Sequence, residues 1–473
     1  MPASCDIVVY GATSFVAKHV FRYFLEVSNT IVDQTFTVSL GGRSKAKMEA
    51  LRKELKEEEN GKAVIKDIFI ASGEDFQALK TMAKNCKVVL NCAGPFAKYA
   101  SKVVEACAEV GTDYVDITAE VIWVAEMRQK FGGKAKKSGA RIVSFCGYDS
   151  IPTDLSVFAS VQALKDKFGD TSVEAEEATV WVHPLGMANG GTIHTAVEIP
   201  VDLKNDLFKN ASSGSKWSLR KVPYFIGDPL LLTHPTKVRH NPDFESRKDR
   251  LAWGEWINQL VHIDRNFSFG VSLPFVMSPV NLKVVHASSV ALNYGKNFTA
   301  NERWIPLGFR WTRVVGIFAF FPLLFFHMFF LAFAGLFKIP VLGKKFLDWV
   351  APPGSGVPDW ACNIGYHEMY ATVTATPEAG TPDHLCNRAY TFMNFTGDPG
   401  NLITAQCVCE SALSLVLNRK DLPERSEDGF GTPSEILGQV LLKRLKETKV
   451  RPIEFRTIVR KNTPRKEIRL YTS

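Results

Sequence analysis

The amino-acid sequence predicts an α/β protein with a doubly wound parallel sheet, a second α+β domain and a separate hydrophobic segment. Three observations support this fold class. Apolar runs alternate with amphipathic stretches through residues 1–150, a glycine turn directly follows the first apolar run, and residues 314–337 carry no charge. Strands that alternate with helices at short spacing are typical of parallel sheets with helices on both faces.

The alternation begins close to the first residue. Asp6–Tyr10 is a short apolar run that predicts a strand, and Phe15–Val27 has apolar residues at helical spacing. The predicted elements that follow are strand 37–40, helix 45–58, strand 64–71, helix 75–84, strand 87–92, helix 98–110, strand 114–117, helix 120–137 and strand 141–146. In such a sheet the ligand binds at the carboxyl ends of the strands.

The stretch G-A-T-S-F-V-A after the first strand indicates a phosphate-binding turn that opens a helix. Gly11 makes the tight turn, Thr13 lies within it, and backbone N–H groups around Ser14, Phe15 and Val16 face a pyrophosphate at the helix start. Ser14 occupies a position that is glycine in such turns. Its Cβ would crowd the phosphate, whereas its hydroxyl could donate a hydrogen bond to it.

The residues after the second strand select the cofactor. An NAD site has an acidic residue there, but this chain has Arg43, Ser44 and Lys45. Two cations and a hydroxyl suit the 2′-phosphate of NADP(H). The alternative is an ordinary basic helix start at the surface. It is less favoured because cations are destabilising at the positive end of a helix dipole unless an anion is present.

Two further loops hold candidate site residues. Asn91, Gly94 and Pro95 follow the fourth strand and are candidates to line the cofactor; the alternative is a plain tight turn. Tyr148 and Asp149 follow the sixth strand, where a nicotinamide ring would lie, and are candidate proton donors. For Asp149 the alternative is that it caps the next helix, because D-S-x-P is a good helix start.

Several motifs together resemble those of the saccharopine dehydrogenase-like oxidoreductases. They are G-A-T-S-F-V-A, G-G-R-S, N-C-A-G-P-F, Y-V-D-I-T-A-E, C-G-Y-D-S-I-P-T-D-L, G-M-A-N-G-G-T and G-T-P-S-E-I-L-G. The nearest branch comprises the membrane- and lipid-droplet-associated members and the bacterial trans-acting enoyl reductases. The resemblance implies a Rossmann domain, an inserted α+β substrate domain and a C-terminal segment that returns to the body. Ser14 departs from the family glycine, and Ser72 from an aspartate often found near the adenine.

The distribution of charge and the spacing of the cysteines indicate which binding partners and metals to expect. The net charge is +8, and residues 441–473 hold eleven Lys and Arg against three Asp and Glu, so the rest of the chain is balanced. A neutral body argues against nucleic acid, whereas a basic tail suits an anionic surface; a solvated basic helix and strand explain the tail equally well. The nine cysteines show no metal-binding spacing, and we expect no metal.

Residues 314–337 are long enough to enter a membrane. As one helix they would extend about 36 Å, against about 30 Å for the hydrocarbon core of a bilayer. Cations flank both ends, so charge sets no orientation. Because the C-terminal segment is expected to complete the same body, we favour a hairpin or shallow insertion bent at Pro322 over a single crossing. A helix buried between protomers is the remaining alternative.

Together these patterns predict an NADP(H)-dependent reductase that acts on a hydrophobic or lipid substrate at a lipid-droplet surface or the cytosolic face of the endoplasmic reticulum. The expected organisation is an NADP-binding domain (1–150), a substrate domain (151–310), an anchor (311–345) and a C-terminal segment (346–473). A homodimer is compatible with the sequence. The alternatives are a weakly active scaffold or lipid-binding protein of the same fold, and a single-pass membrane protein with an unrelated C-terminal domain.

Overall fold

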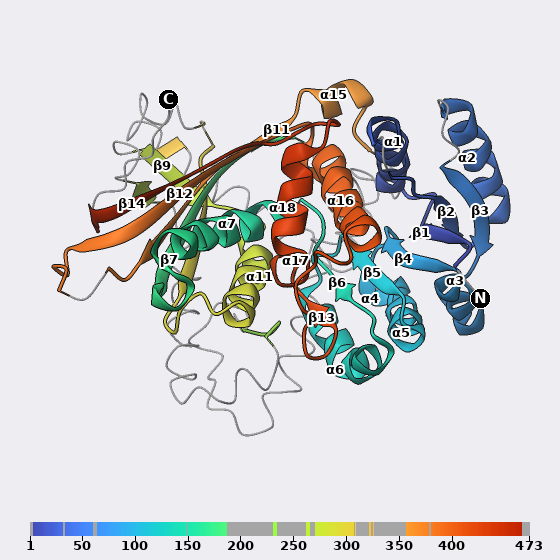
Figure 1. The fold of residues 1–473 in the computed structure, drawn as a ribbon. Coiled ribbons are helices and arrows are strands. Elements are labelled where there is room, and N and C mark those ends of the chain that lie inside the picture. The colour runs from blue at the N-terminus through green and yellow to red at the C-terminus, as the bar shows by residue number, and fades with distance from the viewer. Residues whose placement is uncertain are drawn as a thin grey trace.

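In the computed structural model the chain forms two sheets with a layer of helices between them (Figure 1). The structure describes residues 3–31, 34–59, 64–148, 150–186, 230–233, 262–264, 270–306, 308, 321–322, 325, 356–377 and 380–465. Most of the predicted hydrophobic segment 314–337 therefore lies outside the described residues, which include only Phe321, Pro322 and Phe325 from it.

The first sheet is parallel throughout and confirms the predicted fold class. Its described strands, in spatial order, are β13 (Phe430–Gly431), β6 (Ile142–Val143), β5 (Asp113–Asp116), β4 (Cys86–Asn91), β1 (Cys5–Tyr10), β2 (Val38–Gly42) and β3 (Ile65–Ile70). From β1 the chain adds β2 and β3 on one side and then returns to add β4 to β6 on the other side, so the strand order reverses between β1 and β4, which we call the reversal point. The crevice above that point is where parallel sheets of this order bind dinucleotides.

Helices cover both faces of this sheet. On one face pack α3 (Phe76–Lys84), α5 (Ser101–Val110) and α6 (Val121–Ser138), and the short α4 (Phe96–Tyr99) precedes α5. On the other face pack α1 (Phe15–Thr30), α2 (Lys45–Glu58) and α16 (Thr404–Leu417). The thiol of Cys409 in α16 donates to the Val20 carbonyl of α1 at 3.6 Å, so the C-terminal part of the chain completes this face.

The second sheet is mixed. Its described strands, in spatial order, are β14 (Glu454–Pro464), β12 (Leu385–Thr396), β11 (Tyr366–Ala375), β7 (Ala175–Leu185), β10 (Thr299–Trp304), β9 (Gly270–Pro274) and β8 (His262–Asp264). Only β7 and β10 pair in parallel among the described neighbours. Seven strands with mixed directions agree with the predicted α+β character of the second part.

Helix α7 (Ile151–Phe168) packs against the second sheet and is buried over most of its length. The other described elements of this region are α11 (Ser278–Ala291), α17 (Pro433–Ile436), α18 (Gly438–Glu447), α15 (Asp359–Asn363), η1 (Asp170–Ser172) and η4 (Pro399–Ile403). Asp154 in α7 accepts from the Ser288 hydroxyl of α11 at 2.6 Å and from the Ser434 N–H of α17 at 2.9 Å. This carboxylate therefore joins three helices between the two sheets.

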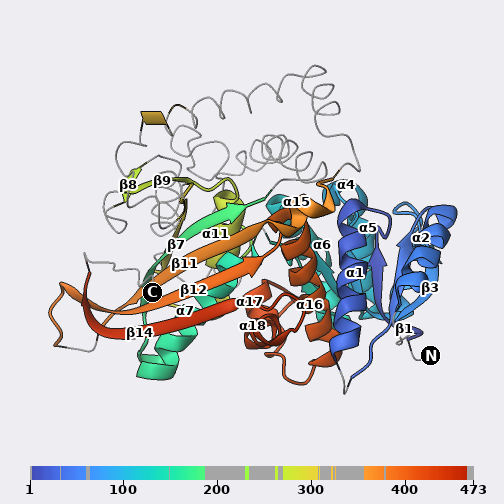
Figure 2. The same cartoon turned by 90° about the horizontal axis from the view of Figure 1, so that it is seen from above.

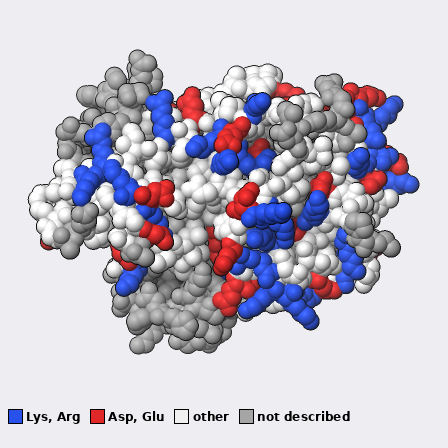
Figure 3. All heavy atoms as spheres, viewed as in Figure 1, with Lys and Arg blue, Asp and Glu red and all other residues white. Residues whose placement is uncertain are grey.

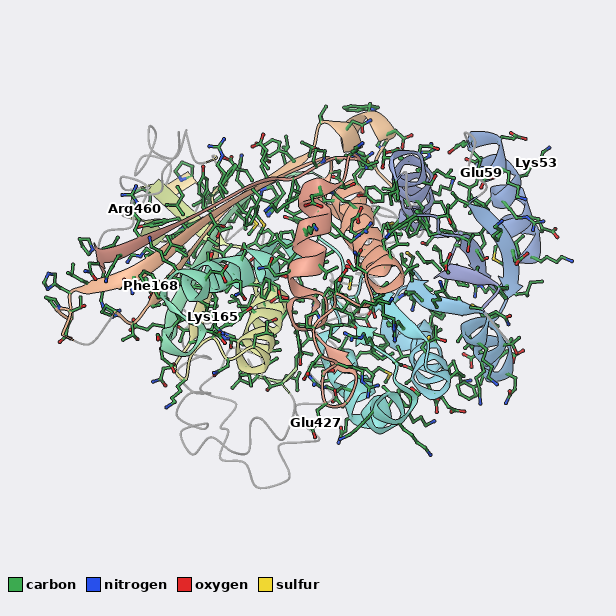
Figure 4. The ribbon with its side chains drawn as sticks, viewed as in Figure 1. Lys53, Glu59, Lys165, Phe168, Glu427 and Arg460 are labelled. Carbon is green, nitrogen blue, oxygen red and sulfur yellow. The ribbon has the colours of Figure 1, made fainter. Side chains whose placement is uncertain are left out.

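Among the described residues, one helical stretch, Pro399–Leu417, is long and apolar enough to cross a membrane. It is 83% buried, because α16 lies on the first sheet, so it is a core helix. The basic tail includes β14 at the outer edge of the second sheet. Arg460 on this strand lies at the opposite end of the molecule from Lys53 and Glu59 at α2, and basic side chains gather at both ends (Figures 3 and 4).

Candidate functional site

Gly11 brings the loops after β1 and β4 together at the reversal point of the first sheet. Its φ is +75°, a conformation that glycine adopts without strain. A Cβ at this position would lie 2.7 Å from the backbone nitrogen of Ala93, which no side chain tolerates. Two of the loops predicted to hold the cofactor are therefore in contact.

Ser14 begins helix α1 as its N-cap. Its hydroxyl accepts from the Ala17 N–H at 3.3 Å, and its φ of −72° is ordinary for a serine. The N–H groups of Phe15 and Val16, the first two helical residues, have no acceptor within the helix, as at any helix start. The serine thus serves the turn as a cap, and the neighbouring backbone keeps the donors that a phosphate needs.

Arg43 and Ser44 lie at the end of β2, one strand away from the turn. Arg43 is exposed and forms no ion pair with any described residue, whereas Lys45 pairs with Glu49 at 3.8 Å. Arg43 is close enough to Tyr10 to counteract the burial that raises the pKa of that hydroxyl. Ser44 caps α2 by position but makes no capping bond with its side chain. A guanidinium and a hydroxyl are thus presented together at this edge.

The loop after β4 is held by side chains inside the protein. Asn91 is fully buried; its amide donates to the Tyr114 hydroxyl at 2.9 Å and its carbonyl accepts from the Ala93 N–H at 2.8 Å. The side chain of Asn91 therefore shapes the loop. Gly94 is exposed and Pro95 is half-buried at the start of α4, so these two residues form the accessible surface of the loop.

Glu120 is a residue of this site that the sequence did not single out. Its two carboxylate oxygens accept from the N–H groups of Phe96 and Ala97, each at 2.7 Å. A carboxylate at the first turn of α4 fills the place that an anion would otherwise take. The phosphate-binding function is accordingly left to the start of α1, not to the start of α4.

Tyr148 meets a residue of the second sheet. Its hydroxyl lies 3.1 Å from Nδ1 of His367, the second residue of β11, and the two rings pack edge to face at 4.9 Å. Its backbone N–H donates to the Thr404 hydroxyl at 3.2 Å. Both side chains are buried, so the pair is held on both sides by the protein. Asp149, the other predicted donor, lies outside the described residues, and Ser150 occupies the N-cap of α7.

His367 is neutral in this setting. Burial, and to a smaller extent the His183 ring, lower its pKa to about 3. One ring nitrogen of a neutral imidazole carries a hydrogen and the other accepts one. Nε2 of His367 is buried and has no hydrogen-bond partner among the described residues. Next to it, the Tyr366 hydroxyl lies 2.7 Å from Nε2 of His183, so two tyrosine–histidine pairs stand at the same end of the second sheet.

The loop that carries Tyr148 is anchored by a buried carboxylate. Asp116, at the end of β5, accepts from the Phe145 N–H at 3.2 Å and from the Ser144 hydroxyl at 3.1 Å. Phe145 has a positive φ of 64°, and the sixth strand ends at Val143, three residues before its predicted end. Burial raises the pKa of Asp116 to about 7. Among the described residues no three His, Cys, Asp or Glu side chains form a group able to hold a metal.

Comparison with known proteins agrees with this geometry. Residues 7–143 match the family described as the saccharopine dehydrogenase NADP binding domain. The matched residues extend from β1 to β6 of the first sheet. The match confirms both the predicted family resemblance and the prediction of NADP(H) as cofactor. The donors at the start of α1 and the exposed Arg43 guanidinium, which forms no ion pair with the described part of the chain, fit the pyrophosphate and the 2′-phosphate of that cofactor.

Two relatives and one solved structure extend the comparison. A Mycobacterium tuberculosis (strain H37Rv) protein named as a trans-acting enoyl reductase is 29% identical over 464 residues, 94% of this chain and 96% of the relative. A lipid droplet localized protein of Caenorhabditis elegans is 32% identical over 41% of this chain and 44% of its own. Saccharopine dehydrogenase (L-Glu forming) of Saccharomyces cerevisiae shows a TM-score of 0.45 at 11% identity, over 96% of this chain and 100% of that chain. The NADP-binding domain and the reductase relative support an oxidoreductase.

Proposed function

We propose that this chain is an NADP(H)-dependent reductase that acts on a hydrophobic, lipid-related substrate at a lipid-droplet or endoplasmic reticulum surface. The observation that carries the proposal is the buried pair formed at 3.1 Å by Tyr148, on the loop that follows β6 of the NADP-binding sheet, and His367 of β11. Hydride transfer to a carbon–carbon or carbon–nitrogen double bond needs a proton donor within hydrogen-bond reach of the product atom. Tyr148 is the donor we assign.

We assign a separate role to each residue of the site. The start of α1 and Arg43 hold the phosphates of the cofactor, and NADPH, when bound, supplies the hydride. Tyr148 gives its hydroxyl proton to the substrate atom next to the one that is reduced. In this assignment His367 carries its hydrogen on Nδ1 and donates it to the Tyr148 oxygen, which stabilises the tyrosinate after the proton has passed to the substrate. Asp149 remains a second candidate donor.

The proposed location at a lipid surface is supported by different observations. Phe321 and Phe325, from the uncharged segment, each have 75% of their surface exposed and are four residues apart. Exposed phenylalanines at this spacing form an apolar face that suits the acyl region of a lipid surface. The lipid-droplet protein among the relatives and the enoyl reductase name of the other favour a lipid droplet and an unsaturated acyl substrate.

A cofactor titration tests the proposal first. The full-length protein should show a larger rise in melting temperature with NADPH than with NADH, because only NADPH has the 2′-phosphate for Arg43. With a medium-chain trans-2-enoyl thioester in mixed micelles, NADPH oxidation should fall by about 100-fold or more in Tyr148→Phe. The matched control Tyr370→Phe, in β11, should keep its activity. Absence of NADPH binding at millimolar concentration would reject the reductase and leave the lipid-surface scaffold.

A further inference from the structure

Strand β5 and the residues after it carry four polar side chains at every second position. Tyr114, Asp116, Thr118 and Glu120 are all buried. Strand β5 lies between β4 and β6 in the first sheet, so its end is next to the loops that follow both neighbours (Figure 1). No step of the proposed reaction uses these side chains. We call Tyr114, Asp116 and Glu120 the β5 clamp.

The β5 clamp holds the loop after β4 at both ends. At the start of the loop, the Asn91 amide donates to the Tyr114 hydroxyl at 2.9 Å. At its end, the Glu120 carboxylate accepts from the first two N–H groups of α4, each at 2.7 Å. Between these points Ala93 lies against Gly11 of the phosphate turn. The β5 clamp therefore fixes the loop that borders the proposed pyrophosphate site.

Asp116 holds the loop after β6, on the other side of β5. Its Oδ1 accepts from the Phe145 N–H at 3.2 Å and from the Thr118 N–H at 3.1 Å. Its Oδ2 accepts from the Ser144 hydroxyl at 3.1 Å. Tyr148 follows Phe145 after only two residues, so the position of its side chain depends on this anchor.

The two sides of the β5 clamp are connected through Tyr114. The carbonyl oxygen of the Asn91 side chain accepts from the Ala93 N–H at 2.8 Å, so its NH₂ group is the part that faces Tyr114. Because the Tyr114 oxygen receives that hydrogen, the hydrogen of its own hydroxyl is available to Asp116. Burial raises the pKa of the Asp116 carboxyl to about 7, and the Tyr114 hydroxyl is among the groups that act against this rise.

Helix α16 supports the Tyr148 loop from another direction. The Tyr148 N–H donates to the Thr404 hydroxyl at 3.2 Å, and a Cβ at Gly147 would lie 3.4 Å from the methyl group of the same side chain. Thr404 begins α16, which lies between α1 and the second sheet (Figure 2). The loop thus rests on α16, and the β5 clamp connects it to the loop after β4.

We propose that the residues of the β5 clamp are positioning residues, which set Tyr148 against the bound cofactor and transmit occupation of the phosphate site to the loop that carries Tyr148. This role rests on the proposed function, because it concerns the distance between the bound cofactor and the Tyr148 hydroxyl. A misplacement of about 1 Å between reacting groups costs on the order of 100-fold in rate. Because the β5 clamp acts through the two loops, its loss should change the rate of reduction more than the affinity for NADPH.

Kinetics of the full-length protein with NADPH and a trans-2-enoyl thioester test the positioning. Tyr114→Phe removes the hydroxyl between Asn91 and Asp116, and kcat should fall by about 10- to 100-fold while the Kd of NADPH changes less than about threefold. Asp116→Asn should act alike, because its amide oxygen keeps the backbone donors while its NH₂ group accepts nothing from Tyr114. The double variant should lose no more than either single variant, since both changes break the same connection.

Thr112→Val is the matched control. Thr112 directly precedes β5 at its other end, and its buried hydroxyl donates to the Ala83 carbonyl at 2.6 Å. The control variant also loses one buried hydrogen bond, so its melting temperature should fall as in Tyr114→Phe, but its kcat should stay unchanged. An equal loss of kcat in Thr112→Val overturns the positioning role, and so does an unchanged kcat in Tyr114→Phe and Asp116→Asn.

Hydrogen exchange tests the transmission without any turnover. The probe 2′-phospho-ADP-ribose has the pyrophosphate and the 2′-phosphate of NADP(H) but no nicotinamide, so it leaves the place next to Tyr148 open. At saturation it should slow amide exchange at residues 11–16 in every protein. It should slow exchange at residues 144–148 in the unchanged protein and in Thr112→Val, but not in Tyr114→Phe. Equal slowing at 144–148 in Tyr114→Phe, or slowing in none of the proteins, overturns the transmission.

The two experiments together separate the β5 clamp from the reductase. If exchange behaves as expected but no protein oxidises NADPH with the enoyl thioester, the reductase is wrong and the transmission stands. If Tyr148→Phe abolishes reduction while Tyr114→Phe and Asp116→Asn reduce at the full rate, the β5 clamp alone is wrong. If 2′-phospho-ADP-ribose does not bind at millimolar concentration, both proposals fail.

Discussion

In the proposed site, the polar groups from the first sheet lie on loops and helix starts, whereas those from the second sheet are side chains on its strands. Gly11 and Arg43 directly follow strands, Ser14 caps α1, and the donors at α1 are backbone N–H groups. His367 and Tyr366 are themselves residues of β11. We therefore expect cofactor binding to depend mainly on backbone geometry together with Arg43, and the proton transfer to depend on the side chains Tyr148 and His367. Substitutions at the first sheet should mainly change NADPH affinity, whereas substitutions at the second sheet should mainly change the rate of reduction.

The largest loss of NADPH affinity is expected at Gly11, where the backbone conformation is most constrained. Gly11→Val adds a Cβ that collides with Ala93 and forces a β-branched residue to a φ of +75°. We expect NADPH affinity to fall by at least about 100-fold, measured by calorimetry, as the two loops separate. Gly133→Ala in α6, where a Cβ meets nothing within 4 Å, is the control and should be neutral or stabilising. Unchanged affinity in Gly11→Val would contradict a site at the reversal point.

The next effect tests whether Arg43 reads the 2′-phosphate. Arg43→Asp removes a charge-assisted hydrogen bond of about 1.5–3 kcal/mol and adds repulsion, so NADPH affinity should fall by about 10- to 100-fold. NADH affinity should change little because it lacks that phosphate. Lys53→Asp, further along α2, controls for general charge. Equal losses for both cofactors would mean that Arg43 has no part in their discrimination.

A smaller effect concerns the carboxylate that joins the helices between the two sheets. Burial raises the pKa of Asp154 to about 6, while an unfolded aspartate has a pKa of about 3.9. The native state therefore holds a proton that the unfolded state has lost between these values, and the free energy of unfolding decreases as pH rises from about 4 to about 6. Asp154→Asn should remove on the order of 2 kcal/mol of this pH dependence.

Urea unfolding at pH 4.5 and pH 6.5 measures this difference. Asp116 acts in the same direction because burial raises its pKa to about 7, so Asp154→Asn should keep a residual slope. An unaltered slope in Asp154→Asn would show that this carboxylate is ionised in the native protein throughout the range.

The smallest effect concerns the serine in the phosphate turn. Because the Ser14 hydroxyl caps Ala17, Ser14→Ala should cost about 1 kcal/mol of stability, and Ser14→Gly only a few tenths. Glycine also removes the Cβ, so NADPH binding by Ser14→Gly should be equal or slightly tighter. A clear loss of NADPH affinity in Ser14→Gly, with stability kept, would assign the hydroxyl to the phosphate and not to the cap.

The elements of the first sheet were predictable because each apolar run is local. The predicted starts and ends of β1 to β5 differ from the observed ones by one or two residues, and α1 extends three residues further than expected. Strand β6 is shorter than predicted because Phe145 turns towards Asp116. The predicted helix 98–110 is two helices, α4 and α5, since Glu120 caps an additional turn at Phe96.

The contacts that the site residues make with distant parts of the chain could not be predicted from the sequence. Tyr148 was identified from its position after a strand, but His367 lies 219 residues away, and no local pattern joins them. Glu120 lay inside a recognised motif, yet its contact with Phe96 depends on two loops meeting. Asn91 was expected to face the cofactor, and its burial against Tyr114 became visible only in three dimensions.

The two-residue strand β13 has a consequence for how the protein is made. It is the outer strand of the first sheet, pairing Phe430 and Gly431 with β6, and α16 covers a face of the same sheet. During synthesis the N-terminal strands leave the ribosome more than 250 residues before these elements. Until then part of one apolar face and one edge of the sheet are uncovered, a state in which nascent chains are prone to aggregate, and the parallel sheet is completed only after Gly431 has been synthesised.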